Sequence, residues 1–147
     1  MCTISKGIIY PVRDLICFKV MFRNEDGTLT SPYHTKHWTL GKTDRTYATM
    51  PRSQVTPMGT VFLGESFHTF QYVKDAIGTK NDLEMCGGYA YDVKKVEVVI
   101  CKCTIPLDSL FIYEGEQPNW SGRLAPCYVS EMLRIDEIID DSNFAKL

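Results

Sequence analysis

Several features that would point directly to a class of function are missing from this chain of 147 residues. No run of apolar residues approaches the ~20 that cross a bilayer, and residues 1–14 lack the apolar core and small-residue cleavage site of a signal peptide. The net charge is only −2, so no overall field attracts nucleic acid or anionic membranes. The sequence therefore predicts a cytoplasmic protein that contacts no membrane.

Motifs of the common enzyme classes are missing as well. The chain has no phosphate-binding loop, no dinucleotide fingerprint, no zinc-protease motif and no nucleophile elbow. Basic residues are spread along the chain and are not interleaved with aromatic residues, which argues against a reader of single-stranded nucleic acid. We find no internal repeat, coiled-coil pattern or low-complexity tract.

The cysteines lie mostly in apolar segments. Disulfide frameworks are typical of short secreted chains, whereas reduced and buried thiols are typical of cytoplasmic proteins. Cys101 and Cys103 share one face of a strand, but a zinc site needs about four ligands and no second pair accompanies them, so we predict no metal site. We expect six free thiols: Cys2, Cys17, Cys86, Cys101, Cys103 and Cys127.

Apolar and β-branched stretches predict a β-rich α+β fold, a single domain with a mostly antiparallel sheet. The strongest strand is 96–105 (VEVVICKCTI), which Pro106 ends. Its alternation predicts a central strand in which Val98 and Ile100 are buried. A second clear strand, 15–22, leads into the turn at 24–27 that should close a hairpin onto residues 28–30.

The remaining strands and loops are less marked. Shorter strands are expected at 8–12, 37–40, 60–63, 109–113 and, as one strand or two, within 128–139. Proline-containing stretches without a clear period predict loops at 45–58 and 114–126. The domain should span residues 1–139, with a frayed tail at 140–147.

One segment has helical periodicity. Its apolar residues recur at the spacing of one helix face, with a capping residue before them and a glycine after them: Thr69 or Ser66, then Phe70, Val73, Ala76 and Ile77, then Gly78. This pattern predicts one helix over about 69–77.

His68 is the most conspicuous candidate for chemistry because it lies between two phenylalanines and before the predicted helix (GESFHTF, residues 64–70). Together with Glu114 it is loosely similar in layout to the mono-ADP-ribosyltransferases. In that family a His or Arg holds NAD and a late Glu activates the acceptor. The resemblance implies catalytic roles for His68 and Glu114 with NAD as cofactor; otherwise His68 is a structural histidine near a helix start.

A second group of candidates is aromatic or histidine and lies near prolines and loops. Such side chains are good anchors for protein interfaces or for base stacking, although tryptophans in strands usually belong to the core. The candidate binding residues are Tyr33, His34, His37, Trp38 and Trp120.

The order of short motifs along the chain also resembles a family of small proteins found in phage and bacterial genomes. The residues that carry the resemblance are Phe18-Lys19-Val20, Ser31-Pro32-Tyr33, Trp38, Gly41-Lys42, Gly64, His68, Phe70, Cys103-Thr104-Ile105-Pro106, Tyr113-Glu114-Gly115 and Ile135–Ile139. No activity is assigned to that family, so the resemblance implies a phage-like origin and no particular reaction.

Good fold signals without a convergent catalytic set favour one hypothesis. The protein is expected to be a small, phage-encoded, non-enzymatic accessory module without a cofactor. Its partner would be a host protein or a small nucleotide-like ligand in the host cytoplasm. The alternative is an enzyme similar to the mono-ADP-ribosyltransferases that uses NAD.

Overall fold

The structure of the protein, a computed structural model, describes residues 3–32, 34–46, 52–55, 61–64, 66–86, 96–118 and 122–139. Strands dominate these residues and one helix accompanies them, which confirms a β-rich α+β fold. The elements are β1 (Thr3–Ile8), β2 (Leu15–Asn24), β3 (Leu29–Ser31), β4 (His34–Trp38), β5 (Thr43–Arg45), β6 (Arg52–Val55), β7 (Val61–Gly64), β8 (Phe67–Phe70), α1 (Val73–Cys86), β9 (Val96–Ile105), β10 (Ile112–Pro118), β11 (Leu124–Ser130) and β12 (Met132–Ile139).

The sheet is organised around β2 and β9, which pair antiparallel over all ten residues of each strand without a register shift. Both sequences are apolar on both faces, as expected of strands that are covered on both sides. Val98 and Ile100 are 6% and 0% exposed, which confirms that β9 is a buried strand. The turn after β2 needs a left-handed residue, and Gly27 supplies it with a φ of 84°.

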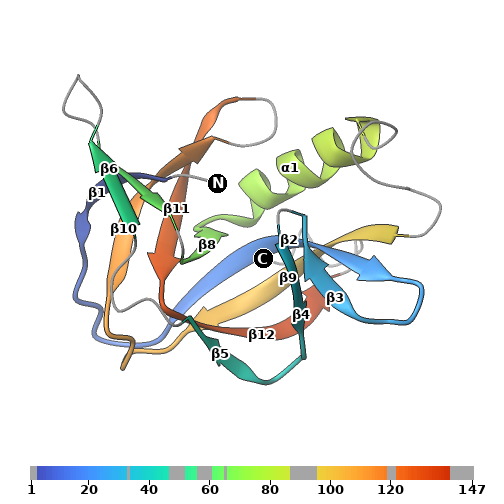
Figure 1. Ribbon diagram of the computed structural model, residues 1–147, viewed down its shortest axis with the longest axis horizontal. Helices are drawn as coiled ribbons and strands as arrows, with labels where there is room; N and C mark the ends of the chain where they lie inside the picture. The colour runs from blue at the N-terminus through green and yellow to red at the C-terminus, as the bar shows by residue number, and fades with distance from the viewer. Residues whose placement is uncertain are drawn as a thin grey trace.

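Around this pair the strands follow the order β5-β12-β9-β2-β8-β11-β10-β1-β7-β6. β3 pairs with β2, and β4 pairs with β3. The strands β3 and β4 thus form a hairpin, the β3–β4 arm, that is not part of this strand order. In Figure 1 the long strands β2, β9 and β12 run side by side, while β11, β10 and β1 rise steeply at one end of them. The sheet is therefore strongly curved.

Each face of the β2–β9 pair has its own core. On one face α1 lies across the strands (Figure 1), and Ala76 and Leu83 pack with Phe18, Val20 and Phe22 of β2. The other face holds a second cluster, to which β2, β3, β4, β8, β9, β10 and β12 all contribute: Cys17, Met21, Leu29, Trp38, Phe67, Val99, Cys101, Cys103, Ile105, Ile112, Leu133 and Ile135. Residue alternation along β2 separates the two sets.

The helix predicted over 69–77 is wrong in its bounds. Residues 67–70 form β8 and pair with β11, because the partner strand satisfies their backbone groups better than one more helical turn. The helix begins at Val73 and continues through Gly78 to Cys86. Gly78 does not end it, since Ala76 and Leu83 on either side are buried against the sheet and this packing outweighs the glycine's ~1 kcal/mol propensity cost.

Near the N-terminus, strand β1 ends at Ile8, so the strand predicted at 8–12 is wrong. Pro11 lacks the backbone donor that a ladder needs, and the chain leaves the sheet there. The loop predicted at 45–58 is also wrong in part, because β6 lies within it and pairs with β7. That strand is specified by its partner rather than by its own pattern.

Towards the C-terminus, β10 and β11 occupy most of residues 114–126, where a loop was predicted. The two strands pair over seven residues each, and this long pairing extends both beyond their apolar segments. Residues 128–139 belong to two strands that bend apart at Glu131, one of the two options that the sequence left open. The predicted tail, 140–147, lies outside the described residues.

The described thiols are part of the core. Cys17, Cys101, Cys103 and Cys127 are free and fully buried, while nothing is described of the side chains of the other two cysteines. Burial raises the pKa of the Cys101 thiol to about 12. A buried thiol of such high pKa is a poor nucleophile, because the reactive species is the thiolate.

We therefore expect slow thiol labelling in the native protein. At pH 8, a disulfide reagent should modify at most two cysteines quickly and all six only in denaturant. Fast labelling of five or six thiols without denaturant would contradict the burial of these cysteines, and two or more thiols missing after denaturation would reveal a disulfide.

The central position of β9 gives a second prediction. Val98→Asp places an unpaired charge beneath α1 and should cost roughly 3–5 kcal/mol of a total unfolding free energy of about 5–15 kcal/mol. Val12→Asp is the matched control, because Val12 is 93% exposed, and it should change stability by less than about 0.5 kcal/mol. Urea unfolding of both variants measures the difference; equal stabilities would place β9 at an exposed edge.

Candidate functional site

A recess opens where one edge of β2 passes from one neighbouring strand to another. On this edge β2 pairs with β8 at Phe18 and with β3 at Phe22 and Arg23, so the residues between them face a gap in the described sheet. The gap forms a cavity of about 40 Å³. Its walls come from five elements: Lys19 and Val20, Ser31 and Pro32, His68 and Phe70, Thr79 and Leu83, and Gln117.

Lys19 is the charged side chain of this recess. Alternation along β2 places it on the same face as Cys17 and Met21, which belong to the core. Its Nζ donates a hydrogen bond to the carbonyl oxygen of His68 at 3.0 Å, and no carboxylate of the described residues pairs with it. Burial lowers the pKa of Lys19 because removal from water disfavours the charged form.

Thiol groups lie around the lysine. Cys17, Cys101 and Cys103 are its titratable neighbours on β2 and β9. Burial raises the pKa of Cys103, as it does that of Cys101, well above the ordinary value. Both of these thiols are therefore uncharged at neutral pH and cannot neutralise the ammonium group.

Two more polar side chains of the recess are buried without a partner. Gln117 and Thr79 are 2% and 3% exposed. The Oε1 atom of Gln117 and the Oγ1 atom of Thr79 accept or donate no hydrogen bond within the described structure. Buried polar atoms are normally satisfied by protein, water or ligand. The recess thus presents a cation, a hydroxyl group and a carbonyl acceptor to whatever occupies it.

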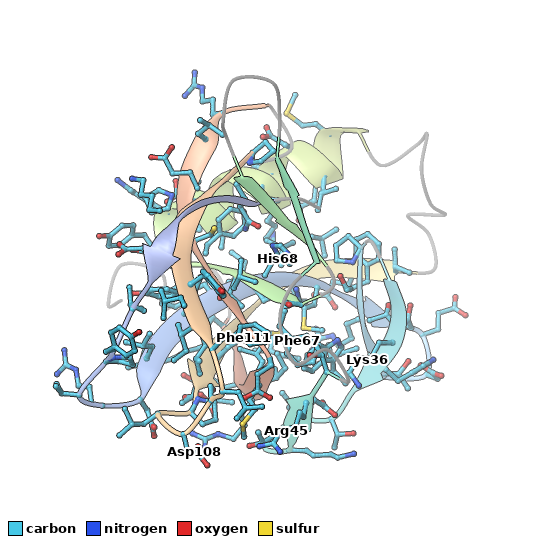
Figure 2. The ribbon with its side chains drawn as sticks, turned by 60° about the vertical axis from the view of Figure 1, so that its left-hand side comes forward. Lys36, Arg45, Phe67, His68, Asp108 and Phe111 are labelled. Carbon is cyan, nitrogen blue, oxygen red and sulfur yellow. The ribbon has the colours of Figure 1, made fainter. Side chains whose placement is uncertain are left out.

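The structure does not bring His68 and Glu114 together. Glu114 lies opposite Tyr128, which lies opposite Thr69, so these three side chains share one face of the sheet. His68 precedes Thr69 and points to the other face. His68 lines the recess, near the centre of the molecule in Figure 2, whereas Glu114 is exposed and accepts a hydrogen bond from Gln71 Nε2 at 3.3 Å.

Trp38 is not the exposed anchor that the sequence suggested. It is 5% exposed, and its ring packs edge-on against Phe67 with the ring centroids 4.8 Å apart. The reason is its register, which sets it opposite the buried Leu29 on the core face of β4. His37, the next residue back, is exposed. Outside the described residues lie Tyr33, Trp120 and the side chain of His34.

Sequence reasoning missed an apolar patch at one end of the molecule. The segments 8–12 and 107–111 meet around a hollow of about 160 Å³. Five large apolar side chains in these segments are between 46% and 93% exposed: Ile8, Tyr10, Val12, Leu107 and Leu110. We call these five residues the end patch. Pro11 and Pro106 were the available signal, because a proline that ends a strand leaves the apolar residues beside it in a loop.

No group of three or more His, Cys, Asp or Glu side chains suited to a metal ion occurs among the residues that the structure describes. Within the same residues, no helix has the length and apolar character needed to cross a bilayer. Comparison of the chain with known protein families, with curated proteins and with solved structures found no match. The resemblance to a phage and bacterial family therefore stays an expectation from motif order.

The setting of Lys19 predicts that this residue destabilises the fold. Lys19→Met removes a desolvated charge and should raise the melting temperature by about 2–4 °C, or about 1 kcal/mol at this chain length. The gain should shrink as the pH rises from the lowered pKa of Lys19 towards the ordinary 10.5. In that window the native protein has already lost the proton that the unfolded chain keeps.

Lys74→Met is the control for this measurement, because Lys74 is exposed on α1 and should leave the melting temperature unchanged. Calorimetry between pH 6 and pH 10 measures all three proteins. A Lys19→Met variant that melts several degrees below the wild type would show that the hydrogen bond to His68 holds the fold together.

Proposed function

We propose that the protein is a non-catalytic binding module that docks onto another protein through its end patch. This proposal is supported by the exposure of the five end-patch side chains, four of which (Ile8, Tyr10, Leu107 and Leu110) line one hollow. Large apolar groups gathered in this way are typical of interaction sites on monomeric proteins. A host protein, one of the two partners expected from the sequence, is compatible with this surface.

Hydrogen bonds hold the two segments of the end patch in place. Ile9 N donates to Ile112 O at 2.9 Å, which ties the first segment to the start of β10. Leu107 N donates to Asp14 Oδ1 at 2.8 Å and so links the second segment to the chain beyond the first. An interface that is ordered before binding loses less conformational entropy when the partner arrives.

Glu131 secures the second segment from inside the sheet. Its side chain is fully buried at the bend between β11 and β12, and its Oε1 accepts a hydrogen bond from Leu110 N at 2.6 Å. Its Oε2 lies 3.2 Å from Arg45 Nε of β5, which supplies the opposite charge. Figure 2 places Arg45 and Asp108 at the same end of the molecule.

The hollow suits one anchoring side chain of a partner. A volume of about 160 Å³ is similar to that of an engineered apolar cavity of ~150 Å³ that accommodates benzene. Its walls include Ile8, Tyr10, Leu107 and Leu110, so an aromatic or branched aliphatic side chain would be surrounded by apolar atoms. Interfaces commonly derive most of their affinity from a few such anchors.

A non-catalytic role is favoured by the separation of His68 and Glu114 on opposite faces of the sheet. General acid–base chemistry needs its groups within hydrogen-bond reach of one substrate. Neither residue belongs to the end patch, so the proposed docking function needs neither of them.

Site-specific cross-linking tests the proposal. A photoreactive p-benzoylphenylalanine at Tyr10 should give one dominant protein adduct in host cells, because Tyr10 is 88% exposed within the end patch. The same group at Tyr72, which is 52% exposed on another part of the surface, is the control and should give no such adduct. Adding Leu110→Ser should abolish the Tyr10 adduct while leaving the melting temperature within a few degrees of that of the parent protein.

Three outcomes would contradict the proposal: equal adducts from both positions, no adduct from Tyr10, or an adduct that survives Leu110→Ser. A Tyr10 adduct made only of two copies of this chain would show that the end patch mediates self-association and not the binding of another protein.

A further inference from the structure

We propose that the recess beside Lys19 binds the oxyanion group of a small molecule, and that Gln117 accepts a hydrogen bond from an adjacent hydroxyl group of the same molecule. This site is separate from the end patch, because the residues that line the recess and those that line the hollow have no member in common. The proposal therefore does not depend on the docking function.

The charge of Lys19 favours an anionic ligand. A cation placed among apolar side chains is costly unless an anion and hydrogen bonds compensate it. Lys19 has one hydrogen bond to a backbone carbonyl and no carboxylate partner in the described residues. An oxyanion in the recess would supply the missing negative charge and a charge-assisted hydrogen bond.

The walls of the recess offer hydrogen-bonding groups to a ligand. The unpartnered Oε1 of Gln117 can only accept, so a ligand that pairs with it must supply a donor. The hydroxyl group of Thr79 can donate to the oxyanion or accept from it. A ligand that satisfies both residues and Lys19 needs negative oxygens and an O–H group close together. Hydroxycarboxylates and protonated phosphates have this combination.

The size of the recess suits a single charged group. A cavity of about 40 Å³ has room for about three water molecules, or for a charged group of similar bulk. Val20, Phe70 and Leu83 form apolar walls of the recess. Electrostatic attraction is stronger in such surroundings than in water. A whole nucleotide does not fit, although a single phosphate group does.

Nuclear magnetic resonance titration tests the proposal with four probes: glycolate, acetate, inorganic phosphate and methylammonium. We expect glycolate or phosphate to shift the side-chain signals of Gln117 and His68, and methylammonium to leave them unchanged. Lys19→Met should weaken the binding of the effective oxyanion by about tenfold or more, whereas Lys74→Met should not change it.

Gln117→Met tests the hydroxyl contact without altering the charge. It should weaken glycolate binding several-fold and bring it close to that of acetate, which has no hydroxyl group. Binding of glycolate alone would indicate a carboxylate ligand, and binding of phosphate alone would indicate a phosphate ester; either supports the site. The melting temperature of each variant shows that it is folded.

The proposal is overturned if neither oxyanion shifts the signals of Gln117 and His68, or if Lys19→Met and Lys74→Met bind the probes equally well. Loss of the Tyr10 cross-link leaves this result untouched, because that experiment probes a different set of residues.

Discussion

The ten-residue pairing of β2 with β9 is the constraint on which the rest of the structure depends. This pairing occupies one edge of each strand. Every other neighbouring strand must therefore pair with the remaining edge: β12 with β9, and β8 and β3 with β2. The side chains of the pair are apolar on both faces, which requires a cover on each side. The helix α1 covers one face, and the curved sheet with the β3–β4 arm covers the other.

The recess is a direct consequence of this arrangement. Two neighbours share the edge of β2, and neither reaches the residues between Phe18 and Phe22. Lys19 falls in that gap, so its side chain extends from a buried strand and still lines a cavity. Had either neighbouring strand been longer, backbone pairing and side-chain packing would have closed the gap over this position. The position of the cation therefore follows from the lengths of β3 and β8.

The sequence predicted correctly those elements that are determined by residues close together in the chain. The strand 96–105 and the hairpin turn at Gly27 agree with the structure because alternation and turn chemistry are encoded within a few residues. Helix α1 was misplaced, and β6 and most of β10 were predicted to be loops, because distant partners decide those segments. The same limit applies to function. His68 could be singled out from its neighbours, but Lys19 and Gln117 meet only after the sheet has formed.

The end patch and the recess have a thermodynamic feature in common. Each lowers the stability of the isolated chain, one by leaving apolar side chains in water and the other by partly burying a cation that no carboxylate of the described residues compensates. Each becomes favourable only when it is occupied, because a ligand that binds the native state alone stabilises it. Substitutions that stabilise a protein at such positions commonly reduce its function. The proposed binding at both places would explain why this fold has an exposed Tyr10 and a partly buried Lys19.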